Sequence, residues 1–313
     1  MAVIGRFREE REGKLMKKRN VTSTTVLAAA VTALVGASAG IANATEPCGD
    51  FGECKVLVEI NSTDGDVGFH FLMDGSDLRY GALFNPKKRK IYSYGARREL
   101  ARQFVTETFN ESAEPLCWYP EEGDDEYGED VVTLRQFLRR WHEGTYYFFG
   151  IGDDWELSFG ESELSFELPA APTNLMYVTE EEIDDDGEID VEGEISWDEG
   201  DDLGECEIGL SDLETPPEEV PVLAWEVVLE PDVDDGDPLG SMKYVVRIPY
   251  ADEDGEETER EVEVPDDYLE TLPDDTPAKV EIGAIGYDDN ATFTEIGDIC
   301  LNEVDGCEDE EEE

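Results

Sequence analysis

Apolar and polar residues alternate over short stretches through most of this chain, as expected for β-strands with one buried face. In the first half the pattern covers CKVLVEI, GFHFLMDG, LRYGALFNP, KIYSYG, GTYYFFGIG and WELSFGESELSFELP. In the second half it recurs near 174–179, 191–198, 222–230, 243–250, 259–264, 278–286 and 292–300. Turn residues such as Asp64-Gly65-Asp66 separate the strands. The pattern predicts a mainly β chain made of two β-sandwich domains.

Two stretches favour short helices instead. One is Arg97–Thr108, and the other is TLRQFLRRWHEG, in which Leu134, Phe137 and Trp141 recur at helical spacing before Gly144. We therefore expect one or two short helices within the first domain.

A domain boundary is predicted at ELPAAPTNL, where Pro169 and Pro172 favour an extended linker. The charge changes at the same point, since only Lys243, Arg247, Arg260 and Lys279 are basic beyond it. We expect a leader over residues 1–44, domains over 45–168 and 169–302, and an acidic tail over 303–313.

The beginning of the chain has the pattern of a secretory signal. MKKRNVTSTTVLAAAVTALVGASAGIANA starts at Met16 with basic residues, continues with an apolar run, and ends in Ala42-Asn43-Ala44. Cleavage after Ala44 is expected, with residues 1–15 as an upstream extension. An uncleaved anchor is the alternative, but small polar residues dilute the run and it is short for a membrane span. No later segment is apolar enough to cross a membrane, so we expect an exported protein, periplasmic or at the cell surface.

Six cysteines lie beyond the signal, and an even number in an exported protein favours disulfides. Cys48 with Cys54 and Cys300 with Cys307 are close pairs that would staple the two ends of the mature chain, although the count alone leaves other connectivities open. The spacings do not fit a zinc site.

The second half resembles a fibronectin type III domain. The resemblance rests on PAAPTNLMYV followed by GEISWD, with Trp197 at the core tryptophan of the second strand, and on the corner at Leu272–Thr276. Ala278 stands nearest the position where that family has a corner tyrosine. The resemblance implies recognition through loops and sheet faces, or a role as a spacer. The mature chain also resembles exported bacterial two-domain proteins that are functionally uncharacterised, which implies architecture and no activity.

The charge of the chain restricts its partners. It contains 23 basic and 81 acidic residues, for a formal net charge of −58. Nucleic acid is not an expected partner, because phosphate binding requires clustered Lys and Arg. Acidic runs such as Glu180–Glu182 cannot be buried together, so we expect them to be solvated or bound to cations. The surface is interpreted as an adaptation to salt.

One basic cluster stands out against this charge, and we predict that it binds an anionic group or partner. It consists of Lys87, Lys88, Arg89, Lys90, Arg97 and Arg98. Candidate partners are the acidic tail, the second domain or phosphates of the cell envelope. A solvated hairpin is the alternative interpretation.

Calcium is the one metal that the acidic turns suggest, because its ligands are carboxylate and carbonyl oxygens. The candidate ligands are Asp184, Asp186, Glu188, Asp190, Asp232, Asp234 and Asp237. The first four approach an EF-hand loop, but Gly193 stands at the last ligand position and no helices are predicted beside it. Asp-Gly hairpin turns are the alternative.

No catalytic motif is evident, and no catalytic residue is predicted. His70 and His142 are the only histidines, neither has a partner at metal-binding spacing, and both are interpreted as structural or surface residues. The sequence favours a non-enzymatic binding or structural module of the bacterial envelope, whose partner is a protein or glycan, without a cofactor. The alternatives are a calcium-dependent adhesion protein and a polysaccharide- or peptide-acting enzyme using the first domain.

The calcium hypothesis predicts saturable heat when the protein is titrated with millimolar Ca²⁺ at physiological salt. Calorimetry tests it, with Mg²⁺ as the control for general screening of carboxylates. An identical response to both ions, or no saturable heat, would exclude a specific calcium site.

Overall fold

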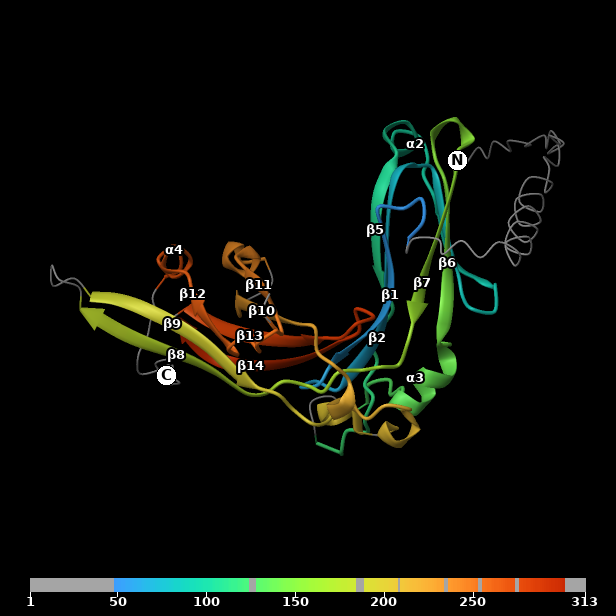
Figure 1. The fold of residues 1–313 in the computed structure, drawn as a ribbon. Helices are drawn as coiled ribbons and strands as arrows, with labels where there is room; N and C mark the ends of the chain where they lie inside the picture. Colours follow the sequence, from blue (N-terminus) through green and yellow to red (C-terminus); the bar gives the residue numbers. More distant parts are fainter. Residues whose placement is uncertain are drawn as a thin grey trace, which may run out of the picture. The chain divides into compact units, whose positions relative to one another are not determined.

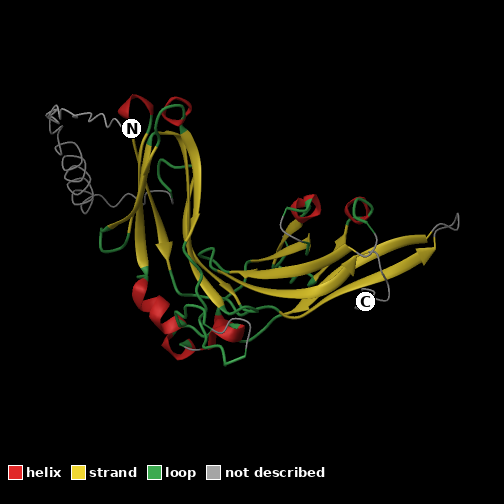
Figure 2. Cartoon of the chain, turned by 180° about the vertical axis from the view of Figure 1, so that it is seen from behind, coloured by secondary structure: helices red, strands yellow, loops and turns green. Residues whose placement is uncertain are grey.

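A computed structural model describes residues 48–123, 128–183, 189–207, 209–233, 236–252, 255–273 and 276–301. The protein is mainly β, as the alternating pattern predicts, and Figures 1 and 2 show strands throughout with few and short helices. The predicted signal segment lies outside the described residues. Within the described ranges, no helix has the length and apolar character that a membrane span requires.

Among its described residues, the first half contains seven strands and two α-helices. The strands are β1 (Glu53–Asn61), β2 (Asp66–Leu78), β3 (Tyr80–Phe84), β4 (Lys90–Gly95), β5 (Val105–Glu111), β6 (Gly144–Ile151) and β7 (Leu157–Leu164). The helices are α2 (Leu100–Gln103) and α3 (Leu134–Arg140), and the short 3₁₀ helix η2 spans Asp153–Trp155.

The described part of the second half contains seven strands and one α-helix. The strands are β8 (Thr173–Ile183), β9 (Ile189–Asp198), β10 (Ala224–Pro231), β11 (Tyr244–Pro249), β12 (Glu261–Val264), β13 (Thr276–Ile285) and β14 (Ala291–Leu301). The helix α4 spans Asp266–Leu269, and 3₁₀ turns occupy Gly204–Glu207, Leu210–Asp212, Pro217–Glu219 and Pro238–Ser241.

The strands form one large sheet and two smaller ones. The large sheet has the order β11-β10-β13-β14-β1-β2-β5, and the smaller sheets are β12-β9-β8 and β4-β3-β6-β7. Alternate residues of β1 and β2, such as Val58 and Phe69, enter one hydrophobic core, and those of β10 and β13, such as Trp225 and Ile282, enter another. The opposite face of the large sheet carries charged residues such as Glu59 and Glu281, because period-two alternation places them there. It also carries a small apolar cluster of Ile285, Ala291 and Phe293.

The two halves meet where β1 pairs in parallel with β14. The pairing spans only Glu59–Asn61 opposite Ala291–Phe293. Next to it, Asn290 is fully buried, and its Oδ1 accepts a hydrogen bond of 2.8 Å from the backbone N–H of Val58. Its Nδ2 donates to the carbonyls of Ser165 and Glu167 at 3.1 and 3.0 Å. One side chain thus satisfies backbone groups of two segments that would otherwise be buried without partners.

Further bonds cross the same joint. The hydroxyls of Ser62 and Thr294 lie 2.8 Å apart, and Thr294 donates to the carbonyl of Pro172 at 2.7 Å. The disulfide Cys117–Cys206 links the two halves covalently across a sequence separation of 89. The expected boundary near 168 therefore lies within one hydrogen-bonded sheet, and the division into two domains stays a prediction.

The expected helix over Arg97–Thr108 is wrong in its second part. Only Leu100–Gln103 is helical, and strand β5 begins at Val105 and pairs with β2. Phe104 ends the helix with a φ of 69°, which continued helix geometry does not allow. The segment VTETFNE alternates with period two and contains β-branched and aromatic residues, and these preferences prevail here. The helix at α3 is confirmed, with Thr133 as its N-cap.

The cysteine predictions are confirmed in part. Cys48 and Cys54 form a disulfide, as expected from their spacing. Cys300 is disulfide-bonded as well, but Cys307 lies outside the described residues, so that pairing stays a prediction. The pair Cys117–Cys206 was not predicted.

We predict that Asn290→Ala lowers the free energy of unfolding by about 2 to 4 kcal/mol, because it leaves buried N–H and C=O groups unpaired. Urea denaturation measures the change. Asn110→Ala is the matched control, because the Nδ2 of Asn110 is buried without a hydrogen-bond partner. Equal and small effects of both substitutions would contradict the role given to Asn290.

Candidate functional site

The predicted basic cluster divides between the two ends of the β3–β4 hairpin. Lys87, Lys88 and Arg89 lie in the turn and are exposed. Arg97 and Arg98 follow Gly95, which pairs with Tyr80 at the other end of the same strands. A six-residue strand separates these ends by roughly 16 Å, so the structure does not join the six residues into one site.

Two further basic residues lie near the turn of the hairpin, and the sequence pattern did not predict them. Nζ of Lys87 donates to Nε2 of His142 at 2.5 Å, which holds the turn against the segment that follows α3. Arg139 and Arg140 are exposed in the last turn of that helix, two to three residues before His142. Nζ of Lys88 lies 5.7 Å from the ring centre of Tyr147 on β6. We call Lys87, Lys88, Arg89, Arg139 and Arg140 the basic surface.

Lys90 leans away from this surface. Its Nζ donates to the hydroxyl of Tyr80 at 3.2 Å and lies 5.9 Å from the centre of that ring. The basic surface therefore consists of side chains from the turn itself and from the end of α3.

Three arginines of the basic surface differ in their partners from seven other cations of the chain. Across the described residues, carboxylates pair with Lys55, Arg79, Arg135, Lys243, Arg247, Arg260 and Lys279. In the same ranges, Arg89, Arg139 and Arg140 form no ion pair with a carboxylate. Glu143 and Glu163 lie nearby in the chain, but they accept hydrogen bonds from Phe166 and Thr145. The surface thus presents exposed cations from the turn and from α3 in an otherwise acidic chain.

Arg97 and Arg98 lie at the loop end of the first half, beside α2 (Figure 1). Arg79 connects the loops there, since it pairs with Asp153 at 2.8 Å and its guanidinium lies 5.0 Å from the ring centre of Phe104. The carboxylate of Asp153 therefore neutralises the charge of Arg79 at this end.

Two of the calcium candidates can be placed. Asp237 is exposed, and its carboxylate accepts a hydrogen bond of 2.9 Å from the N–H of Leu239 as the cap of a 3₁₀ turn. Asp232 is exposed, and its N–H donates to the carbonyl of Pro277. Asp184, Asp186, Glu188 and Asp234 lie outside the described residues, and Asp190 is placed only as part of β9. Calcium binding stays a prediction.

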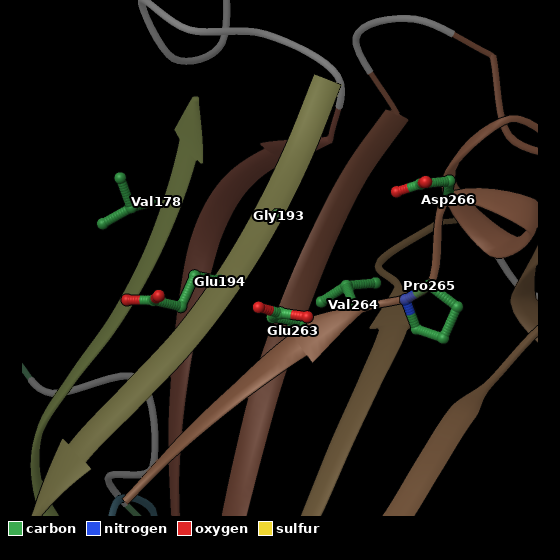
Figure 3. Close-up of a pocket in the computed structure, with 7 residues that line it drawn as sticks. All are labelled: Val178, Gly193, Glu194, Glu263, Val264, Pro265 and Asp266. Atoms are coloured by element: carbon green, nitrogen blue, oxygen red, sulfur yellow. The ribbon is translucent and has the colours of Figure 1, made fainter. Parts of the chain in front are cut away.

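A hollow of about 370 Å³ lies against the three-stranded sheet (Figure 3). Val178, Glu194 and Glu263 form one row across β8, β9 and β12, and Asp266 of α4 also lines the hollow. Like charges directly opposite each other repel, and no basic residue lines the space. The hollow does not suit an anionic ligand.

The charged face of the large sheet contains a histidine that the sequence placed among structural residues. His70 is only 2% exposed, and its Nε2 lies 2.6 Å from Oε1 of Glu114. Its Nδ1 lies 3.6 Å from Oε2 of Glu59, which is too long for a hydrogen bond. Burial lowers the pKa of His70, but the hydrogen bond to Glu114 and the charges of Glu59 and Glu111 outweigh it, so the pKa is raised.

Several carboxyl groups on this face have pKa values above their ordinary range. Burial raises the pKa of Glu59. Burial, together with the charges of Glu114 and Asp64, raises the pKa of Asp66 to about 6. Burial and the neighbouring Glu295 raise the pKa of Glu281 to about 7. The face therefore contains carboxyl groups that lose their protons near neutral pH, which the acidic composition alone could not reveal.

Known proteins give little guidance. No family model matches the chain, and no curated protein matches it. Among solved structures, one match comes from a study titled "Structural basis of neurohormone perception by the receptor tyrosine kinase Torso". It covers 87% of this chain and 86% of that chain at 7% identity, with a TM-score of 0.21. A similarity this weak supports no argument about fold or function.

We predict that Glu281→Gln weakens the dependence of stability on pH. The pKa of Glu281 is about 7 in the folded protein against an ordinary value of 4.5, so ionisation costs folding free energy and stability falls as pH rises between these values. The substitution should raise the free energy of unfolding at pH 7.5 by about 1 to 2 kcal/mol and change it little at pH 4.5. Urea denaturation at both values measures this, and the exposed Glu156→Gln is the control. An increase in the free energy of unfolding that is equal at both pH values would contradict the ionisation of Glu281 as its cause.

Proposed function

We propose that this is an exported, non-enzymatic binding protein whose basic surface holds an anionic polysaccharide of the cell envelope. The observation that carries the proposal is the gathering of Lys87, Lys88, Arg89, Arg139 and Arg140 in a chain of net charge −58. Exposed charges of one sign on one surface attract a ligand of the other sign.

The chemistry of the surroundings favours a hydrated polymer over a protein partner. Protein interfaces have an apolar core with aromatic residues. Next to the turn, the exposed large apolar side chain is Ile91, at 41% exposure, and the turn itself is polar. Arginine binds carboxylate groups through two parallel hydrogen bonds, which suits a repeating acidic sugar.

Two further observations support parts of the proposal. Disulfides at Cys48–Cys54 and Cys117–Cys206 fit an exported protein, because they persist in oxidising compartments. The strand orders β12-β9-β8 and β11-β10-β13-β14 support a fibronectin type III-like second half, since that family places its A, B and E strands in one sheet and C, F and G in the other. In this proposal the second half acts as a spacer for the binding surface.

The enzyme alternative has less support. Among the described residues, the imidazoles of His70 and His142 have side-chain hydrogen bonds to Glu114 and Lys87, and neither bonds a serine or threonine hydroxyl. Calcium-dependent adhesion depends on turns that the structure describes only in part.

The test is binding of the mature protein to polygalacturonate, with neutral dextran as the ligand control. We expect the triple variant Lys87→Glu, Lys88→Glu, Arg89→Glu to bind at least about tenfold more weakly, because each reversal replaces attraction with repulsion. The matched control is Arg97→Glu, Arg98→Glu at the other end of the same hairpin, which should bind like the wild type.

Calorimetry at several salt concentrations measures both variants. The proposal predicts that affinity falls as salt screens the surface. The proposal would be overturned by an equal loss of affinity in both variants or by binding of the wild type to dextran. An unchanged affinity in the triple variant would overturn it as well.

A further inference from the structure

The register of the large sheet brings an imidazole and two carboxylates together on its charged face. His70 on β2 lies opposite Leu57, and Glu59 on β1 lies opposite Gly68. Both side chains therefore point away from the core that contains Phe69. Glu114 reaches the same point from the segment after β5, and the ligand atoms of the three residues all lie within 4.8 Å of one another.

The histidine has one ring nitrogen without a partner. Nε2 is engaged with Glu114, whereas Nδ1 is buried and forms no hydrogen bond with any described residue. A buried polar atom without a partner costs free energy, so its retention requires an explanation. Nδ1 points to Oε2 of Glu59 across 3.6 Å. Two ligands of a tetrahedral zinc ion, with bonds of about 2.0 to 2.1 Å, stand roughly 3.3 Å apart.

The absence of a side chain at residue 68 makes room for this arrangement. A Cβ on Gly68 would lie 2.4 Å from Oε1 of Glu114 and 2.7 Å from Nε2 of His70. Any other residue would push Glu114 away from the imidazole. The contact therefore depends on this glycine, and it fixes the ring with Nδ1 directed toward Glu59.

Positive side chains do not neutralise the group. Lys55 pairs with Glu53 and Asp289, and Lys279 pairs with Glu230 and Glu295. The charges that act on Glu59 come from His70 and from further carboxylates, Glu111, Glu114 and Glu226. A divalent cation would offset this excess.

We propose that Nδ1 of His70 and the carboxylate of Glu59 bind a divalent transition metal ion of the Zn²⁺ type. Imidazole nitrogen favours such ions, whereas Ca²⁺ and Mg²⁺ take oxygen ligands. His70 is held by burial, and the side chain of Glu59 is 37% exposed, so the carboxylate can turn to meet the ion. Water completes the coordination.

Glu114 is a positioning residue in this site. It accepts the hydrogen bond from Nε2–H, which leaves Nδ1 as the ligand atom, as second-shell carboxylates do in many zinc sites. With two protein ligands, micromolar affinity is expected. The site lies on another sheet from the basic surface and does not depend on the proposed function.

The test uses the mature protein and Zn²⁺, with excess Mg²⁺ present to occupy surface carboxylates. The chain has only two histidines, so nitrogen NMR of the imidazoles reads the site directly. We expect one equivalent of Zn²⁺ to shift the ring signals of His70 and leave those of His142 in place. His142→Gln assigns the signals and should leave the Kd measured by calorimetry within about twofold.

The variants separate the roles of the three residues. His70→Gln and Glu59→Gln should raise the Kd for Zn²⁺ by about 100-fold or more, and Glu114→Gln by roughly tenfold, because a Gln oxygen still accepts from Nε2–H. If His70→Gln does not fold, Glu59→Gln, at a half-exposed position, decides the question. Unchanged affinity in Glu59→Gln, a shift at His142 alone, or no saturation in millimolar Zn²⁺ would overturn the proposal.

Discussion

The three-residue parallel pairing of β1 with β14 is the constraint on which the rest of this protein depends. It turns the strands of two halves into one sheet, and it decides which residues of β1 face a core and which face outward. The pairing is too short to hold by its own backbone bonds. Asn290 extends the pairing by one further hydrogen bond, which its side-chain oxygen accepts from the backbone N–H of Val58. The hydroxyls of Ser62 and Thr294 form another hydrogen bond between the two halves. His70 and Glu59 face outward because of the antiparallel register between β1 and its other neighbour, β2.

Much of the fold could be predicted from local pattern, because strands and turns depend on neighbouring residues. The strands of both halves follow period-two alternation, and α3 follows its apolar spacing and its cap at Thr133. β5 was mistaken for helix because its alternation is short and follows a real helical turn at Leu100–Gln103. The joint could not be predicted, since Val58 and Asn290 are 232 residues apart.

The residues of the functional candidates also differ in how far the sequence could predict them, since some are neighbours in the chain and others are not. Lys87, Lys88 and Arg89 are adjacent in the sequence and form one surface, whereas Arg139 and Arg140 join it through tertiary packing. The signal that could have found them is the run of two arginines at the end of a helix that leads into a strand. His70 matched no metal motif, because its partners stand 11 residues before it and 44 residues after it. Gly68 was a local clue, since glycine within a strand often marks a close approach.

The parallel pairing also bears on the order in which the chain acquires its structure. A chain is synthesised from its N-terminal end, so β1 is available long before its neighbour β14. Contacts between residues this far apart in the sequence close slowly, because a long loop must first be organised. The strand β1 is then an open edge that waits for a partner, and open edges invite aggregation. The dense negative charge of the intervening segments keeps waiting chains apart from one another, which gives the acidity a role before the protein is folded.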